Sequence, residues 1–278
     1  MAEFKPDEAA FNQLRGKVVV LSGAATGIGA VTAKLLVKYG AFVVFGDTND
    51  KAASDVAKAN SRITFEHCDV SVYADIYSLF EKAYEKHGRV DHAVSCAGIF
   101  EQGNWFDPAL TMDTVSEQGN TEVMDVNVMG TLNFCRIAAV FLRDGMQNGK
   151  QNKSIVLLSS VSAFRESPGL YLYQTSKHAI QGILRSSRKF LWERDGVRIN
   201  AVNPGVTDTP MAAGIAQKFR DEGVYVQSPE SVANIILGLI TKDDLVGKAV
   251  YVEGGDGWEF EDSFYRESQD GWAKSPRE

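Results

Sequence analysis

Ser22-Gly23-Ala24-Ala25-Thr26-Gly27-Ile28-Gly29 is the stretch that decides the fold of this chain. It follows the apolar run Val18-Val19-Val20-Leu21 and precedes a helical pattern from Ile28 to Tyr39. Glycine at these positions allows a tight turn and lets backbone N–H groups approach a pyrophosphate, which the helix N-terminus then faces. The spacing is G-x-x-x-G-x-G, and a strand before it and a helix after it predict a dinucleotide-binding turn. The alternative is a glycine-rich turn without a ligand.

The rest of the chain alternates short apolar runs with longer helical patterns. Further strands are predicted at residues 41–45, 63–68, 90–95, 155–159, 197–202 and 249–252, the last strand of the series. Further helices are predicted at residues 50–59, 72–87, 122–142, 173–195 and 231–240. Continuous apolar strands between helices indicate a parallel sheet covered on both faces. The predicted fold class is therefore α/β, a single-domain doubly wound parallel sheet (Rossmann fold) with helices on both faces.

This pattern divides the chain into three parts. Residues 1–14 are an N-terminal extension, residues 15–257 the Rossmann-fold domain, and residues 258–278 an acidic, aromatic C-terminal tail. Two segments inside the domain fit the alternation poorly, residues 100–121 and residues 211–227. Both follow strands at the carboxyl edge of the sheet, where ligands bind in such folds. The second is predicted to form a substrate lid at about residues 210–228.

Composition narrows the function classes. The 278 residues are 44% hydrophobic and carry a formal net charge of −7, which argues against a general nucleic-acid binder. The three cysteines, Cys68, Cys96 and Cys135, include no C-x-x-C pair, and the four histidines have no metal-ligand spacing. We therefore expect no disulfide framework and no metal site. We also expect no signal peptide, no membrane span and a cytoplasmic location.

Asp47 closes the second predicted strand, 18 residues after Gly29. A carboxylate at this place accepts hydrogen bonds from the ribose hydroxyls of a dinucleotide and repels a 2′-phosphate. The only cation nearby is Lys51, so the sequence favours NAD over NADP. The alternative is that Asp47 only caps the following turn.

Tyr173-Gln174-Thr175-Ser176-Lys177 places a phenol and an ammonium four positions apart, on one face of a helix. Free tyrosine has a pKa of about 10, and a nearby cation lowers that pKa by stabilising the phenolate. The pair therefore predicts a general acid/base. In isolation, such a pair is also typical of a solvated helix face.

Together these motifs resemble the short-chain dehydrogenase/reductase family, over about residues 14–255. Ser22–Gly29 resembles the family's T-G-x-x-x-G-I-G, with serine in place of threonine. Ser95-Cys96-Ala97-Gly98 resembles N-N-A-G, but both asparagines are replaced. The side-chain contacts of those asparagines are therefore not expected, whereas the backbone role of Ala97-Gly98 is. The other matching residues are Asp69-Val70, Asn127, Ser160 (13 residues before Tyr173), Tyr173, Lys177 and Pro204-Gly205-Val206-Thr207-Asp208-Thr209.

The resemblance implies four catalytic residues. Tyr173 takes the hydroxyl proton in oxidation and returns it in reduction. Lys177 lowers the pKa of Tyr173 and holds the nicotinamide ribose. Ser160 stabilises charge on the substrate oxygen, and Asn127 positions a water in a proton relay through Lys177. The alternatives are a turn serine at the strand end for Ser160 and a helix-interior polar residue for Asn127.

The resemblance also implies the binding residues. Thr207 and Thr209 would hold the carboxamide and fix the nicotinamide face, and the hydride chemistry belongs to the cofactor. The full cofactor set is Ser22, Gly23, Thr26, Gly27, Ile28, Gly29, Asp47, Asp69, Val70, Ala97, Gly98, Tyr173, Lys177, Pro204, Gly205, Thr207 and Thr209. The substrate set is Ser160, Phe164, Leu170, Tyr173, Met211 and Ile215, with Trp105, Phe106 and Tyr171 as further candidates. Ordinary core or lid packing is the alternative for the apolar members.

The predicted function is an NAD-dependent oxidoreductase that interconverts a bulky, largely apolar secondary alcohol and its ketone. Residues 243–249 resemble hydroxyprostaglandin dehydrogenases, and the N-terminus and the segment at 100–121 resemble fungal secondary-metabolism dehydrogenases. The alternatives are an NADH-dependent carbonyl reductase and a non-catalytic dinucleotide-binding regulator. Apolar faces on the helices at 122–142 and 173–195 suggest, by analogy, a homodimer or homotetramer. No nucleic-acid or membrane partner is expected.

Overall fold

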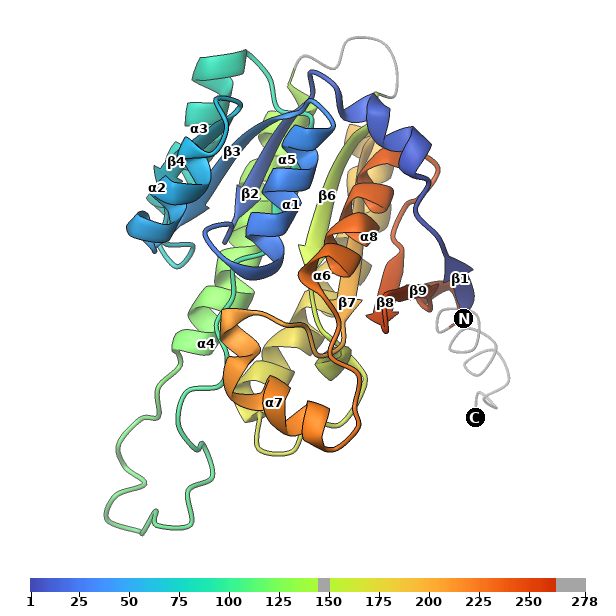
Figure 1. The fold of residues 1–278 in the computed structure, drawn as a ribbon. Coiled ribbons are helices and arrows are strands. Elements are labelled where there is room, and N and C mark those ends of the chain that lie inside the picture. The colour runs from blue at the N-terminus through green and yellow to red at the C-terminus, as the bar shows by residue number, and fades with distance from the viewer. Residues whose placement is uncertain (145–150, 264–278) are drawn as a thin grey trace, which may run out of the picture.

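The computed structural model describes residues 1–144 and 151–263. Within them the strands form one nine-stranded sheet, in the order β1-β9-β8-β7-β6-β5-β2-β3-β4 (Figure 1). The strands from β2 to β8 are parallel, so the predicted parallel-dominant α/β fold is confirmed. Their bounds are β2 Val18–Ser22, β3 Phe42–Asp47, β4 Ile63–His67, β5 His92–Ser95, β6 Lys153–Leu158, β7 Val197–Pro204 and β8 Ala249–Glu253.

Helices cover both faces of the sheet (Figure 1). One apolar layer lies under α1 (Gly27–Lys38), α2 (Asp50–Lys58) and α8 (Pro229–Thr241). The other lies under α3 (Tyr73–His87), α5 (Thr131–Arg143) and α6 (Tyr171–Asp195). Strand β2 shows why the strands are apolar throughout, because Val19 and Leu21 join the first layer while Val18 and Val20 join the second.

The helix predicted at 122–142 contains an irregular turn. It begins as α4 (Glu122–Met124), passes through a π-helical turn at Asp125–Gly130 and continues as α5. The helix at residues 122–143 is long and apolar enough to cross a membrane by length and composition. Half of its apolar 18-residue stretch, however, is buried inside the molecule. The core helix of a folded domain meets the same test, and here α5 packs on the sheet.

The edge of the sheet next to β8 differs from the prediction. Strand β9 (Asp256–Glu259) follows β8 and pairs with it antiparallel, so β8 is not the last strand. Strand β1 (Ala2–Phe4) then pairs antiparallel with β9. The boundary predicted after Gly257 falls within β9. These strands are too short to show a periodic signal, and the tail aromatics Phe264, Tyr265 and Trp272 lie outside the described residues.

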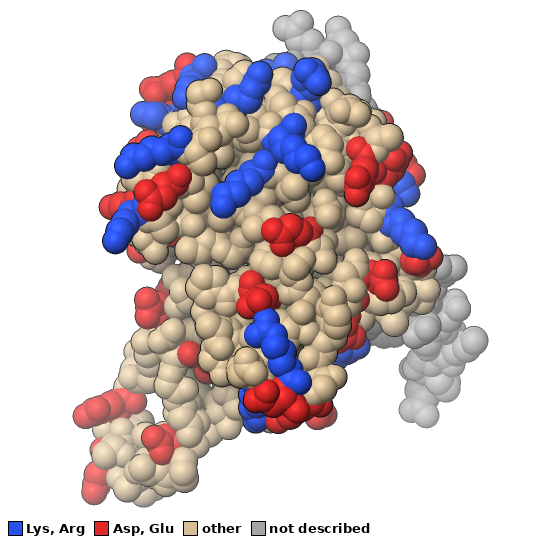
Figure 2. Space-filling model, in the orientation of Figure 1, with Lys and Arg blue, Asp and Glu red and all other residues tan. Residues whose placement is uncertain are grey.

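Two irregular segments lie beside the carboxyl ends of the strands (Figure 1). Residues 100–121, called the insert below, contain no helix or strand and project away from the domain. The insert carries four acidic residues and neither lysine nor arginine, and Figure 2 shows only acidic colour on this projection. In the second segment, α7 (Ala213–Asp221) lies below the strand ends. The insert and α7 thus flank the carboxyl ends of the parallel strands.

Candidate active site

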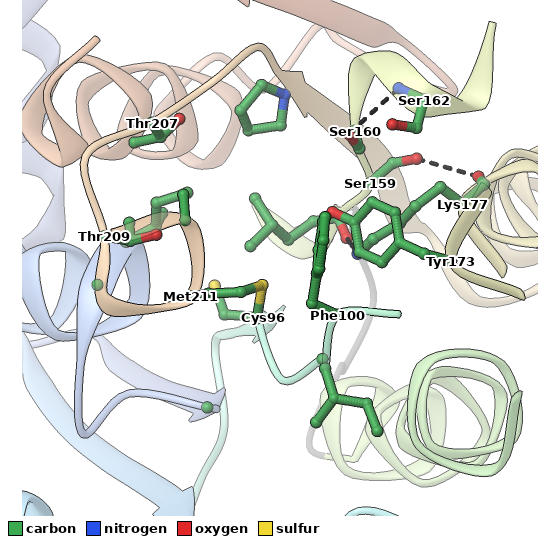
Figure 3. Close-up of a pocket in the computed structure, with 18 of the residues that line it drawn as sticks. Cys96, Phe100, Ser159, Ser160, Ser162, Tyr173, Lys177, Thr207, Thr209 and Met211 are labelled. Carbon is green, nitrogen blue, oxygen red and sulfur yellow. Dashed lines mark hydrogen bonds between the residues drawn. The ribbon is translucent and has the colours of Figure 1, made fainter. Parts of the chain in front are cut away.

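A cavity of about 960 Å³ lies at the carboxyl edge of the sheet. The glycine-rich turn forms part of its lining, and Ser160, Tyr173, Lys177 and Met211 form another part (Figure 3). Ser160 follows β6, the tyrosine and lysine come from α6, and Met211 comes from the segment before α7. Residues far apart in the sequence therefore meet where the parallel strands end, as expected for this class of sheet.

The glycine-rich turn is closely packed, and this packing requires glycine. Gly23 has φ +69°, and a Cβ there would lie 2.5 Å from the Cα of Ala97. A Cβ on Gly29 would lie 2.1 Å from the carbonyl oxygen of Gly23. Thr26, the N-cap of α1, makes no side-chain capping bond, so the first N–H groups of this helix are left for another acceptor. These features fit the pyrophosphate of a dinucleotide.

Asp47 lines the cavity and also braces the turn. Its Oδ2 accepts from the N–H of Ala25 at 2.9 Å, and its Oδ1 accepts from the N–H of Asn49 at 2.9 Å. Asp47 therefore does cap the following turn, and its position at the cavity wall also fits the ribose interpretation. One carboxylate can serve both, because each of its oxygens accepts more than one hydrogen bond.

Most of the other predicted cofactor residues line the cavity, and Ser22 does not. Its side chain is fully buried, and its Oγ accepts from the N–H of Ala97 at 3.3 Å. Ser22 ends β2 with its side chain turned toward β5, so it fixes the neighbouring loop instead of facing a ligand. The residues that do line the cavity are Gly23, Thr26, Gly27, Ile28, Gly29, Asp47, Asp69, Val70, Ala97, Gly98, Tyr173, Lys177, Pro204, Gly205, Thr207 and Thr209.

A residue that the sequence interpretation missed supports Thr207. The buried Gln227 donates from Nε2 to the carbonyl oxygen of Val252 at 3.0 Å and to Thr207 Oγ1 at 3.3 Å. Its backbone also pairs with the Thr207 segment as an isolated bridge. Gln227 lies beyond α7, so no local pattern connects it with Thr207.

The three predicted catalytic residues on the cavity wall lie close together (Figure 3). Ser160 is the second residue after β6, and its Oγ accepts from the N–H of Ser162 at 3.2 Å, so it is also the turn serine of the alternative interpretation. Lys177 Nζ lies 5.3 Å from the centre of the Tyr173 ring and donates to the carbonyl oxygen of Leu158 at 3.2 Å. The phenol, ammonium and hydroxyl thus share one buried corner.

The expected lowering of the Tyr173 pKa is not found in the protein alone. Burial raises the pKa of Tyr173, and the neighbouring Ser160 hydroxyl offsets only part of this rise. Burial also lowers the pKa of Lys177 to about 8. The reason is that both groups are buried. Burial disfavours the charged form of each, and this effect outweighs the stabilisation that an ammonium gives to a phenolate.

Asn127 lies behind the cavity wall instead of on it. Its side chain is fully buried, and Nδ2 donates to the carbonyl oxygen of Ile99 and to Ser176 Oγ, both at 3.0 Å. Its Oδ1 accepts from the N–H of Ile99 at 2.8 Å. These bonds engage both amide hydrogens and one lone pair of the oxygen, and Asn127 is not among the residues that line the cavity. Asn127 ties the loop after β5 to α6, and its water-positioning role in a relay through Lys177 stays a prediction.

The structure places some of the predicted substrate residues at the cavity and others away from it. Leu170, Met211 and Ile215 line the cavity with Ser160 and Tyr173. Four other predicted aromatic residues lie outside it. Phe164 packs on Tyr251 and Phe260, Phe106 packs on Tyr171, and Trp105 is on the insert. Apolar cavity residues that the sequence interpretation missed include Phe100, Val161, Phe219 and Val224. The position of Phe100, two residues after the Ala97-Gly98 motif, was the available signal for that residue.

Cysteine or metal chemistry finds no support in the described part of the chain. No three His, Cys, Asp or Glu side chains gather there to hold a metal ion. Cys96 lines the cavity, but burial raises the pKa of its thiol to about 12, so the thiolate is strongly disfavoured.

Comparisons with known proteins agree with this site. A family model described as enoyl-(acyl carrier protein) reductase matches residues 23–255. A short chain aldehyde dehydrogenase 1 of Euphorbia lathyris is 32% identical over 248 residues, covering 86% of this chain and 82% of the relative. A 5′-hydroxyaverantin dehydrogenase of the fungus Dothistroma septosporum is 29% identical over 255 residues, covering 86% and 80%.

A solved structure gives the same result. The 3-ketoacyl-(acyl-carrier-protein) reductase of Brucella melitensis, complexed with NADH, has a TM-score of 0.77 and 26% identity. The match covers 87% of this chain and 98% of the reductase. The glycine-rich turn, the shared corner of Ser160, Tyr173 and Lys177, and these matches lead to one conclusion. The chain belongs to the short-chain dehydrogenase/reductase family, oxidoreductases that act on CH–OH groups with a nicotinamide dinucleotide.

Proposed function

We propose that this enzyme uses NAD to interconvert a bulky, largely apolar secondary alcohol and its ketone, with Tyr173 as general acid/base. The observation that supports this most is the cavity that joins the glycine-rich turn to Ser160, Tyr173 and Lys177. One end suits a dinucleotide, and the other offers a proton acceptor beside a hydroxyl donor. A protein of this fold that lacked these three side chains at the cavity would support a proposal of dinucleotide binding without catalysis.

The residues of the chain supply the proton chemistry. When bound, the oxidised nicotinamide supplies the acceptor for the hydride that leaves the carbinol carbon. The Tyr173 phenolate accepts the alcohol proton. The C–H electron pair leaves with the hydride, and the O–H electron pair forms the C=O bond. The Ser160 hydroxyl hydrogen-bonds the reacting oxygen, and Lys177 stabilises the phenolate. In reduction Tyr173 returns the proton.

The outer cavity favours a neutral, apolar substrate. Phe100, Leu170, Ile215, Phe219 and Val224 provide apolar lining. The one guanidinium among the described lining residues, Arg165, is paired with Glu253 through contacts of 3.2 and 3.4 Å. This pairing offsets the positive charge that would otherwise attract an anionic substrate. The cavity volume of about 960 Å³ holds both a cofactor and a bulky molecule.

Direct turnover tests the proposal. NADH fluorescence is followed after the protein is mixed with NAD and a panel of bulky secondary alcohols, and the reverse reaction is followed with NADH and the matching ketones. Signal with either partner supports the proposal and shows which direction is faster. Absence of turnover across both panels, with NADH binding confirmed separately, would favour the non-catalytic regulator.

Replacing Asp47 with alanine should shift the cofactor preference toward NADP. The wild type is expected to use NAD better, because the carboxylate repels a 2′-phosphate. We expect the ratio of kcat/KM for NAD over NADP to fall by at least about tenfold, which is only ~1.4 kcal/mol. The measurement is this ratio, since loss of the bond to Ala25 will weaken both cofactors. Asp50→Ala, on the exposed start of α2, is the matched control. An unchanged ratio would refute the NAD assignment.

An exposed apolar face supports an oligomer as part of the proposal. Tyr77 and Tyr84 on α3 and Leu132 and Val140 on α5 are each 39–48% exposed. The ring of Phe141 joins the two helices between them. Light scattering after size exclusion measures the mass, and a monomer at micromolar concentration would contradict this part.

A further inference from the structure

Helix α6, which carries Tyr173 and Lys177, begins without a side-chain cap of its own. Its N-cap is Leu170, which makes no side-chain capping hydrogen bond. In a helix that starts at Tyr171, the N–H groups of Leu172 and Tyr173 are the ones that an N-cap side chain ordinarily satisfies. These donors have no partner within the helix. Without an acceptor from another part of the chain, the first turn would fray.

A carboxylate from the insert supplies both missing acceptors. Glu101 Oε1 accepts from the N–H of Leu172 at 3.2 Å, and its Oε2 accepts from the N–H of Tyr173 at 2.7 Å. The two partners lie 71 and 72 residues later in the sequence. A negative charge at this end also interacts favourably with the helix dipole. Glu101 thus acts as an N-cap delivered from a distant segment.

Aromatic contacts reinforce the same junction. The ring of Phe100 lies 4.9 Å from the ring of Tyr173, centre to centre, and Figure 3 shows the two side by side. The ring of Phe106 lies 4.8 Å from that of Tyr171. Three residues of the insert therefore contact three consecutive residues of α6, and one of these is the proposed acid/base.

The chain just before Glu101 is also fixed to α6. Asn127 holds both the N–H and the carbonyl of Ile99, and its Nδ2 donates to Ser176 Oγ. Ser176 Oγ in turn donates to the carbonyl oxygen of Tyr173 at 2.7 Å. The backbone of Tyr173 is thus held from two sides, through its carbonyl by Ser176 and through its N–H by Glu101.

We infer that Glu101 is a positioning residue for the reaction: its carboxylate holds the first turn of α6, so that Tyr173 keeps its place on the cavity wall. This inference rests on the proposed function, in which Tyr173 moves the proton. A cap that served only the fold would change stability and leave turnover at a permissive temperature unaffected. A positioning residue changes kcat, because reacting groups must be held in a narrow geometry.

The test compares Glu101→Ala with Glu117→Ala, which removes the same charge from an exposed part of the insert. We expect Glu101→Ala to lower kcat by about 10- to 100-fold, since a displacement of about 1 Å can cost 100-fold. NADH affinity should stay close to that of the wild type, because the glycine-rich turn is untouched. Glu101→Gln keeps one carbonyl oxygen as acceptor and should recover part of the loss. Glu117→Ala should behave as the wild type does.

Hydrogen exchange provides a readout that does not need turnover. Amides of the peptide that covers residues 171–176 should exchange faster in Glu101→Ala and not in Glu117→Ala. Unchanged protection of this peptide, or wild-type kcat in Glu101→Ala, or an equal loss in Glu117→Ala, would overturn the inference. Wild-type turnover is measured first. A wild type without turnover would overturn the proposed function and the positioning role of Glu101, while exchange would still decide whether Glu101 caps α6.

Discussion

Replacing Tyr173 with phenylalanine should lower kcat by about 100- to 10,000-fold, the range that a positioned general acid/base contributes. The substitution removes one oxygen and keeps the ring, so the contact with Phe100 at 4.9 Å between ring centres should survive. The loss should appear in kcat and in kcat/KM together, because the proton transfer occurs only on the way to the transition state. Steady-state kinetics on the substrate found by the alcohol panel gives both values.

Tyr171→Phe is the matched control for this prediction. Tyr171 lies on the same helix, is 37% exposed and is absent from the cavity lining. NADH should bind Tyr173→Phe, Tyr171→Phe and the wild type with similar affinity, as measured by its fluorescence. Near-normal turnover in Tyr173→Phe would refute the mechanism, whereas a matching loss in Tyr171→Phe would show that the effect arises from packing of the helix.

The largest effect on stability is expected at Asp91, at the opposite edge of the sheet. Its carboxylate is 1% exposed and accepts from Val18 N at 2.8 Å and from Arg89 and Lys153. Lys153 is itself only 4% exposed. Asp91→Asn should lower the free energy of unfolding by about 3–5 kcal/mol, because it leaves the Lys153 ammonium buried without its anion. Denaturant titration with tryptophan fluorescence measures this difference.

A double variant separates the lost ion pair from other effects. In Asp91→Asn with Lys153→Met, no unpaired charge remains, so much of the lost stability should return. If the double variant is as unstable as the single one, the buried ammonium is not the cause. NADH binding below the unfolding temperature should be normal in both variants, because this cluster lies at the start of β5 and β6 and the cofactor site lies at their opposite ends.

The same carboxylate predicts how stability depends on pH. Burial alone would raise the pKa of Asp91, but Arg89, the N–H of Val18 and Lys153 together lower it to about 2. Since the folded pKa lies below the unfolded value of about 3.9, this stabilisation is complete above pH ~4 and is lost as the pH falls toward 2. The stability difference between wild type and Asp91→Asn should therefore shrink over that window. A constant difference from pH 6 to pH 2 would contradict the assignment.

Local patterns in the sequence determined the fold and most of the cofactor site. The turn at Ser22–Gly29 depends on glycines whose close packing allows no side chain, so residue type and spacing report it directly. Continuous apolar strands follow from burial on both faces, as the alternation within β2 shows. Tyr173 and Lys177 share a helix face because of their spacing alone. Each of these features is encoded within a few consecutive residues.

Only the tertiary structure decided which neighbours these residues have. Ser22 turns away from the cavity, and Phe100 lines it while Phe164 does not, because side-chain direction depends on the packing of distant elements. The cap that Glu101 provides to Tyr173 joins residues 72 positions apart. The pKa of Tyr173 rises because of burial, which no local pattern encodes. Sequence thus determined the chemical groups present, and long-range packing decided their solvation, orientation and partners.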